Sequence, residues 1–190
     1  MGIRRQDCDA LREGSGTLKN IYLIGFMGTG KSAVGSVLAE QLGMACVEMD
    51  RQIETQQNMT ITEIFERYGE TYFRDLETEF LRAQGSGRPV VVSCGGGSVL
   101  REENAALMRE RGSIVLLTAR PETVYERVKR STNRPVLNGH MNVSDIGELM
   151  EKRRVRYEEV ADLRVATDGR SIREICEEIQ ERMAEKQEQG

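Results

Sequence analysis

The sequence predicts a doubly wound α/β domain with a five-stranded parallel sheet. Short apolar runs alternate along the chain with longer segments of helical periodicity, and this alternation is typical of parallel sheets covered by helices on both faces. Residues that could carry chemistry follow the apolar runs, as they do when ligands bind beyond the carboxyl ends of parallel strands. The expected strands are Ile21–Ile24, Ala45–Met49, Pro89–Cys94, Ser113–Thr118 and Leu163–Ala166.

Helices are expected between these strands. Apolar residues at positions 34, 37, 38 and 42 predict a helix over Lys31–Leu42. A second periodic pattern predicts a helix over Glu70–Arg82. Two capping boxes, in which a Ser or Thr precedes a Glu by three positions, mark further helix starts. They are Thr60 with Glu63 and Ser171 with Glu174, the latter opening the C-terminal helix.

Two segments fit neither element. Residues 131–147 carry Pro, Asn, Gly and His without a clean period, and an irregular segment of that length is typical of a lid or of disorder. Residues 1–18 are polar and are expected to be a flexible extension. Residues 19–190, which include the irregular segment at 131–147, are expected to be a single domain.

Composition excludes several classes of protein. Hydrophobic residues make up 38% and charged residues 31% of the chain, as in globular proteins. No apolar run is long enough to span a membrane, and the N-terminus has no secretory signal. The net charge of −4 argues against a general nucleic-acid binder.

The cysteines indicate a reducing, cytoplasmic setting rather than a metal site. None of the four forms a C-x-x-C pair and the chain has one histidine, so zinc is not expected. Cys46 and Cys94 lie in strand-like runs and are predicted to be buried thiols.

The glycine-rich stretch Gly25–Ser32 fits G-x-x-x-x-G-K-[ST], the Walker A loop. In such a loop the backbone N–H groups cradle phosphates, the lysine reaches the β- and γ-phosphates, and the serine hydroxyl binds Mg²⁺. The weaker dinucleotide pattern G-x-G-x-x-[GA] also fits from Gly28, with Asp50 near the spacing of its ribose-binding acid. The Walker pattern is favoured because it gives Lys31 and Ser32 a role. The expected ATP-binding residues of the loop are Gly28, Thr29, Gly30, Lys31, Ser32 and Ala33.

Further motifs resemble the shikimate kinases, small P-loop kinases related to the nucleoside-monophosphate kinases. They follow the loop "GFMGTGKS" in order as "MDRQIE", "GETYFRDLE", "CGGG", "LTARPETVYERV", "RPVL" and "KRRVRYEEVAD". The resemblance covers the chain from about Asn20 to the C-terminal helix. It implies a three-layer P-loop fold with a mobile lid and transfer of the γ-phosphoryl group of ATP to the 3-hydroxyl of shikimate, a step toward chorismate and the aromatic amino acids.

The resemblance also implies an acceptor site. Asp50 would bind the shikimate hydroxyls and orient or deprotonate the attacking one, although an aspartate here could also cap a helix. Arg74 and Arg153 would grip the shikimate carboxylate, because a planar guanidinium binds a carboxylate bidentately. The same Arg74 could instead form an i,i+4 ion pair with Glu70. Gly96 and Gly97 would line the shikimate site.

On the nucleotide side, the resemblance implies a lid arginine at Arg134 that stabilises charge on the transferring group. Lys31, Asp50 and Arg134 would be the catalytic residues. Arg130 and Arg170 match positions that flank the adenine. Ser93 stands where a hydroxyl residue reaches the magnesium shell, and His140 has no assigned role.

The chain departs from the family pattern at the end of the second strand, where Glu48 replaces the usual aspartate two residues before Asp50. We expect one Mg²⁺ per subunit, bound through Ser32 and the ATP phosphates, with Glu48 reaching its water shell. The resemblance suggests a monomer that acts on small molecules. A related kinase such as a gluconate kinase, or an ATP-binding regulator without turnover, remains an alternative.

Overall fold

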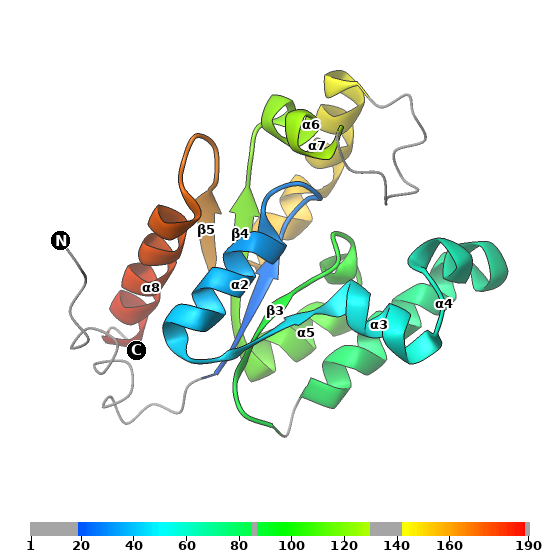
Figure 1. Cartoon of the computed structure of the whole chain (residues 1–190), viewed down its shortest axis with the longest axis horizontal. Coiled ribbons are helices and arrows are strands. Elements are labelled where there is room, and N and C mark those ends of the chain that lie inside the picture. The colour runs from blue at the N-terminus through cyan, green and yellow to red at the C-terminus, as the bar shows by residue number, and fades with distance from the viewer. Residues whose placement is uncertain (1–18, 85–86, 130–141, 189–190) are drawn as a thin grey trace.

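A computed structural model describes residues 19–84, 87–129 and 142–188. Five strands form one sheet in the order β2-β3-β1-β4-β5, and every neighbouring pair is parallel. The predicted five-stranded parallel sheet is therefore confirmed (Figure 1). The strands are β1 (Asn20–Ile24), β2 (Ala45–Glu48), β3 (Val90–Ser93), β4 (Gly112–Thr118) and β5 (Leu163–Ala166).

Helices connect the strands throughout the described residues. They are α2 (Lys31–Leu42), α3 (Met49–Gln57), α4 (Ile61–Ala83), the 3-10 helix η2 (Ser98–Leu100), α5 (Glu102–Arg111), α6 (Pro121–Val128), α7 (Val143–Val160) and α8 (Ile172–Glu188). None of them combines the length and apolar content that a membrane span requires.

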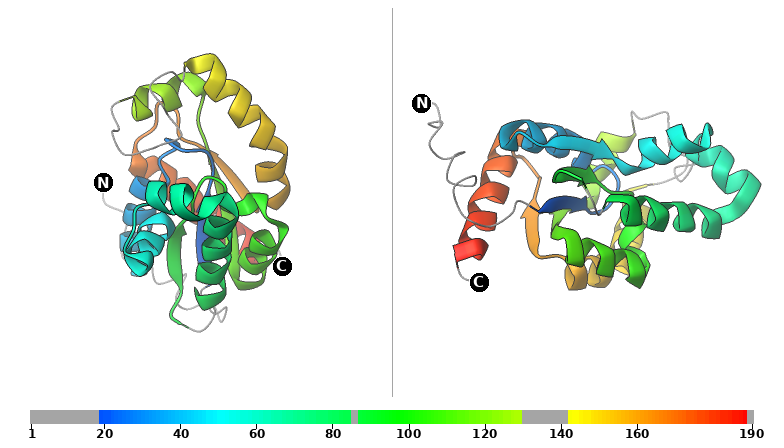
Figure 2. Two further views of the ribbon diagram at one scale, coloured as in Figure 1. Left: turned by 90° about the vertical axis from the view of Figure 1, so that its right-hand side faces the viewer. Right: turned by 90° about the horizontal axis from the view of Figure 1, so that it is seen from below.

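The helices cover both faces of the sheet, which gives three layers (Figure 2). Successive residues of a strand point to opposite faces, and β1 shows the division. Ile21 and Leu23 pack on the face covered by α2 and α8. Tyr22 and Ile24 pack on the face covered by α3, α4, α5 and the end of α7. The carboxyl ends of all five strands consequently meet at one edge of the sheet.

The edge strands differ from the central ones. All five residues of β1 are buried, whereas Ala45 and Cys46 of β2 are exposed. The prediction of a buried Cys46 is wrong, because β2 pairs only with β3 and one of its sides is open. The prediction for Cys94 is confirmed.

The boundary between β2 and α3 also differs from the prediction. The strand ends at Glu48, which is the N-cap of α3, so the helix begins at Met49 rather than after it. Asp50 therefore lies in the first turn of α3 and does not cap it. A carboxylate there lies near the positive end of the helix dipole.

Helix α4 joins two segments that the sequence predicts separately. The Thr60–Glu63 capping box is present at its start. The helix is interrupted at Gly69, whose φ of 81° and ψ of 174° are non-helical. Phe65 and Phe73 pack across this kink with their ring centroids 5.0 Å apart. The glycine thus redirects the chain so that the second half of α4 lies against the sheet.

Replacing Gly69 with Ala is expected to lower the free energy of unfolding by about 1–3 kcal/mol, because this conformation is accessible almost only to glycine. Crowding would not contribute, since a Cβ at this position meets nothing within 4 Å. Denaturant titration measures the loss. Gly87→Ala is the control, because Gly87 is equally open and has no positive φ. Equal losses in both variants would show that backbone strain is not the cause.

Helix α7 begins earlier than the sequence analysis implied. Asn142 accepts a hydrogen bond from the Asp145 N–H at 3.0 Å, and the Asp145 carboxylate accepts from the Asn142 N–H at 3.3 Å. This capping box uses Asn and Asp instead of Ser/Thr and Glu, so residues 142–147 were wrongly assigned to the irregular segment. The rest of that segment and the extension at 1–18 lie outside the described residues. The capping box of Ser171 with Glu174 is present.

Candidate active site

The loop between β1 and α2 carries the Walker A residues at the carboxyl edge of the sheet. Gly25, Gly28 and Gly30 have φ values of 134°, 75° and 97°. A Cβ at Gly25 would lie 2.3 Å from the Leu117 carbonyl oxygen. The loop therefore requires glycine for both conformation and close approach. It leads directly into the N-terminus of α2, where free backbone N–H groups and the helix dipole favour an anion.

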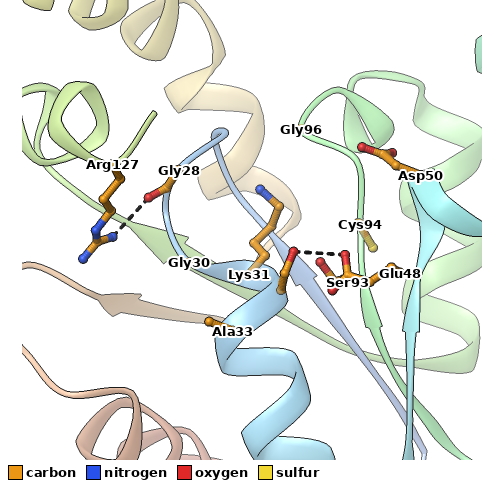
Figure 3. Close-up of a pocket in the computed structure, with 11 residues that line it drawn as sticks. Gly28, Gly30, Lys31, Ala33, Glu48, Asp50, Ser93, Cys94, Gly96 and Arg127 are labelled. Carbon is orange, nitrogen blue, oxygen red and sulfur yellow. Dashed lines mark hydrogen bonds between the residues drawn. The ribbon is translucent and has the colours of Figure 1, made fainter. Parts of the chain in front are cut away.

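The loop borders a cavity of about 260 Å³ (Figure 3). The cavity lies between the phosphate loop on one side and the ends of β2 and β3 on the other. Its lining residues are Gly28, Gly30, Lys31, Ser32, Ala33, Glu48, Asp50, Ser93, Cys94, Gly96 and Arg127.

Lys31 lies along this cavity with its ammonium group held by its own loop. Its Nζ donates to the carbonyl oxygens of Gly25 at 2.8 Å and Phe26 at 2.9 Å. The hydroxyl of Thr29 donates to the same Phe26 carbonyl at 2.8 Å. Thr29 thus contributes to the shape of the loop, whereas Lys31 supplies a positive charge at the cavity.

Ser32 and Glu48 meet across the cavity floor. The Ser32 hydroxyl donates to Glu48 Oε2 at 3.0 Å (Figure 3). A hydroxyl and a carboxylate are oxygen ligands of the kind that Mg²⁺ prefers, and Mg²⁺ commonly uses one or two such groups together with waters and phosphates. Within the described ranges no three His, Cys, Asp or Glu side chains form a metal cluster. The donors present therefore fit an ion that is held jointly with a nucleotide.

A pair of carboxylates lies beyond the phosphate loop. Asp50 of α3 and Glu77 of α4 both approach Gly95, and each places one oxygen 2.7 Å from the position that a Cβ of Gly95 would take. Glu77 is fully buried. The pKa of Glu77 is raised to about 7, chiefly by burial; Arg74 opposes the shift and the negative charge of the neighbouring Asp50 adds to it. Gly95 and Glu77 were not singled out from the sequence.

Arg74 joins this carboxylate pair to the glycine turn after β3. It forms ion pairs with Glu77 and with Glu70, both at 2.8 Å, and its side chain is 17% exposed. A Cβ at Gly97 would lie only 2.5 Å from Arg74 Nη2. Gly97 therefore leaves the space that the guanidinium occupies. The ion pair with Glu70, the ordinary structural explanation for this arginine, does form. It uses only part of the guanidinium group, whose Nη1 pairs with Glu77.

On α7, only one of three neighbouring arginines faces the cavity side of the glycine turn. Arg153 Nη1 donates to the Gly96 carbonyl at 3.5 Å, and its guanidinium lies 5.7 Å from the centre of the Phe26 ring. Arg154 instead pairs with glutamates of its own helix. Arg156 donates to the Val99 carbonyl and pairs with Glu102.

Comparison with known proteins identifies the family. Residues 27–184 match the family model described as shikimate kinase. The chain belongs to the shikimate kinase family. A shikimate kinase of Persephonella marina is 44% identical over 162 residues, which are 85% of this chain and 97% of that protein.

Solved structures agree with this membership of the shikimate kinase family. The structure of shikimate kinase from Acinetobacter baumannii in complex with shikimate has a TM-score of 0.86 and 34% identity, and the match covers 94% of this chain and 98% of that one. A gluconokinase from Sinorhizobium meliloti has a TM-score of 0.54 at 20% identity, with 90% and 95% covered. The similarity to the gluconokinase shows only that the two chains share a fold. The resemblance inferred from the sequence motifs is confirmed.

In this member of the shikimate kinase family, the sequence analysis missed an arginine beside the phosphate loop. Arg127, near the end of α6, donates to the Gly28 carbonyl at 3.1 Å and to the hydroxyl of Thr167 at 3.0 Å. Its guanidinium lines the cavity next to the loop (Figure 3). The available signal was a basic residue in the last turn of the helix that follows β4, a strand next to β1.

Of the other arginines predicted for the nucleotide side of the shikimate kinase site, only Arg170 lies among the described residues. Arg170 pairs with Glu178 and donates to the Glu174 carbonyl at 3.0 Å. It is not among the residues that line the cavity. Arg130, Arg134 and His140 lie outside the described residues.

Proposed function

We propose that this protein transfers the γ-phosphoryl group of ATP to the 3-hydroxyl of shikimate. The observation that carries the proposal is the position of two arginines. Arg74 and Arg153 approach neighbouring glycines of one turn, and Asp50 lines the same cavity as Gly96 of that turn and the phosphate loop (Figure 3). An acceptor with one carboxylate and several hydroxyls suits this arrangement, because guanidinium groups bind the carboxylate and Asp50 accepts from a hydroxyl.

The nucleotide would be held by the phosphate loop. Backbone N–H groups at the start of α2 and the ammonium group of Lys31 would bind its phosphates. The Ser32 hydroxyl would bind Mg²⁺ together with those phosphates, and the Glu48 carboxylate would reach the ion's water shell. When bound, the ion would neutralise charge that develops on the phosphoryl oxygens. Arg127 would lie beside the nucleotide, and Arg134 is proposed to complete the site.

In the transfer step, the 3-hydroxyl oxygen forms a bond to the γ-phosphorus while the bond from that phosphorus to the β,γ-bridging oxygen breaks. ADP leaves with the bonding electron pair. Asp50 accepts the hydrogen bond of the attacking hydroxyl and is positioned to receive its proton. Positioning and charge stabilisation supply most of the catalysis in reactions of this class.

The test is ADP release from Mg·ATP with shikimate, with gluconate and without an acceptor. Release with shikimate alone is the expected result. Release with gluconate would instead support a gluconate kinase and would overturn the roles given to Arg74 and Arg153. Protein that binds ATP but does not release ADP with either acceptor would support a regulator. Shikimate at 100 times its dissociation constant should also stabilise the nucleotide-free protein by about 2.7 kcal/mol.

Replacing Glu48 with Gln is expected to raise the Mg²⁺ concentration for half-maximal ATP binding by about tenfold, because a group in the metal's outer shell loses its charge. Titration of ATP binding against Mg²⁺ measures the change without requiring turnover. Glu40→Gln serves as the control, because Glu40 lies exposed at the far end of α2. If Glu48→Gln behaves like Glu40→Gln, Glu48 does not contact the ion's shell.

A further inference from the structure

Tyr157 lies where α7 crosses the glycine turn that follows β3. Its side chain is 5% exposed and packs in the apolar cluster on that face of the sheet. Its hydroxyl donates a hydrogen bond to the Gly96 carbonyl oxygen. The positive charge of Arg153, one helical turn earlier, acts on the phenol, and its Nη1 approaches the same carbonyl at 3.5 Å. Phenol, guanidinium and carbonyl therefore form one small network.

This network lies beside both arginines that are proposed to bind the acceptor. Gly96 contacts Arg153, and the adjacent Gly97 leaves the space for Arg74. Gly96 also lines the cavity near Asp50 (Figure 3). Since both arginines lie against consecutive residues of one turn, a shift of Gly96 would change the separation between their guanidinium groups.

The hydroxyl of Tyr157, rather than its ring, holds the turn. The ring could pack equally well as phenylalanine, whereas a buried phenol requires a hydrogen-bond partner. Burial raises the pKa of Tyr157, and the positive charge of Arg153 only partly opposes that shift. The phenol thus stays protonated at neutral pH and remains a hydrogen-bond donor to Gly96.

We propose that Tyr157 is a positioning residue of the acceptor site. By holding the Gly96 carbonyl and the Arg153 guanidinium together, it sets the separation of Arg153 from Arg74 and hence the affinity for the acceptor's carboxylate. It does so without touching the acceptor. The inference rests on the proposed function, because it assumes that the two arginines bind one carboxylate.

Tyr157→Phe tests the proposal. The KM for shikimate should rise about three- to tenfold, the change expected from loss of one hydrogen bond, while the KM for ATP stays unchanged. Binding of shikimate without nucleotide should weaken by the same factor. The matched control is Tyr22→Phe, which removes another buried hydroxyl, one that accepts from Asn20 at 3.0 Å and lies in β1. That variant should lose stability alone, with both KM values unchanged.

A double-mutant cycle separates positioning from general loosening of the fold. If Tyr157 acts through Arg153, the effects of Tyr157→Phe and Arg153→Lys on shikimate binding should be less than additive in free energy. Additive effects would overturn the proposal, as would a Tyr157→Phe variant with wild-type KM for shikimate. Equal increases in the two KM values would also overturn it. A wild-type protein that binds ATP but not shikimate would instead overturn the proposed function, and this inference with it.

Discussion

Replacing Asp50 with Asn should lower turnover by about 10²- to 10⁴-fold and leave ATP binding nearly unchanged. The size is that expected for loss of a general base. The substitution keeps the shape of the side chain, so Gly95 can still pass close to it. It removes the carboxylate that would orient the attacking hydroxyl and accept its proton. Asp50 lines the cavity opposite Lys31, away from the groups that would hold the phosphates. Single-turnover measurement of phosphoryl transfer, with ATP binding measured separately, gives the two quantities.

Asp75→Asn is the matched control for this prediction. Asp75 lies one residue from Arg74 on α4 but pairs with Arg101 at 2.7 Å on the exposed side of the helix. The control should transfer phosphoryl groups at the wild-type rate. If Asp50→Asn changed only the KM for the acceptor, Asp50 would bind substrate without assisting the transfer. Loss of ATP affinity in the same variant would indicate a disturbed phosphate loop.

The sequence predicted the features that depend on local patterns. The strands could be found because apolar runs bounded by turns are visible within a few residues, and the Walker A loop because its glycines and lysine are adjacent. Strand order cannot be found in this way, since it depends on pairing between distant residues. Cys46 illustrates the consequence, because its run resembles that of Cys94 although one strand lies at an edge and the other inside the sheet.

Residues of the acceptor site were predicted only where a single motif contains them. Arg153, Arg154 and Arg156 are nearly equivalent in sequence, and only the crossing of α7 over the glycine turn distinguishes them. Glu77 and Gly95 gain significance because α3, α4 and β3 bring them beside Asp50. The sequence of any one of these three elements does not reveal that they come together. The kink at Gly69 is similar, since a glycine within a helical pattern does not reveal its φ value.

Glu77→Gln should change how the stability of the protein depends on pH. In the folded state burial raises the pKa of Glu77 from its usual 4.5 to about 7. The folded protein therefore keeps the Glu77 proton between these values, while the unfolded chain releases it. The stability contributed by this proton is fully present below about pH 4.5 and is lost as the pH rises to about 7. The glutamine variant has no such loss.

From pH 5 to pH 8, the unfolding free energy of Glu77→Gln should accordingly rise by about 2–3 kcal/mol relative to that of the wild type, since one pKa unit corresponds to 1.36 kcal/mol. Denaturant titrations of both proteins across this range measure the difference. Glu79→Gln, two residues away on the exposed side of α4, should show a nearly constant difference from the wild type. A constant difference for Glu77→Gln as well would mean that Arg74 keeps Glu77 ionised throughout. In that case the ion pair would outweigh burial, and the carboxylates beside Gly95 would both carry charge when the acceptor binds.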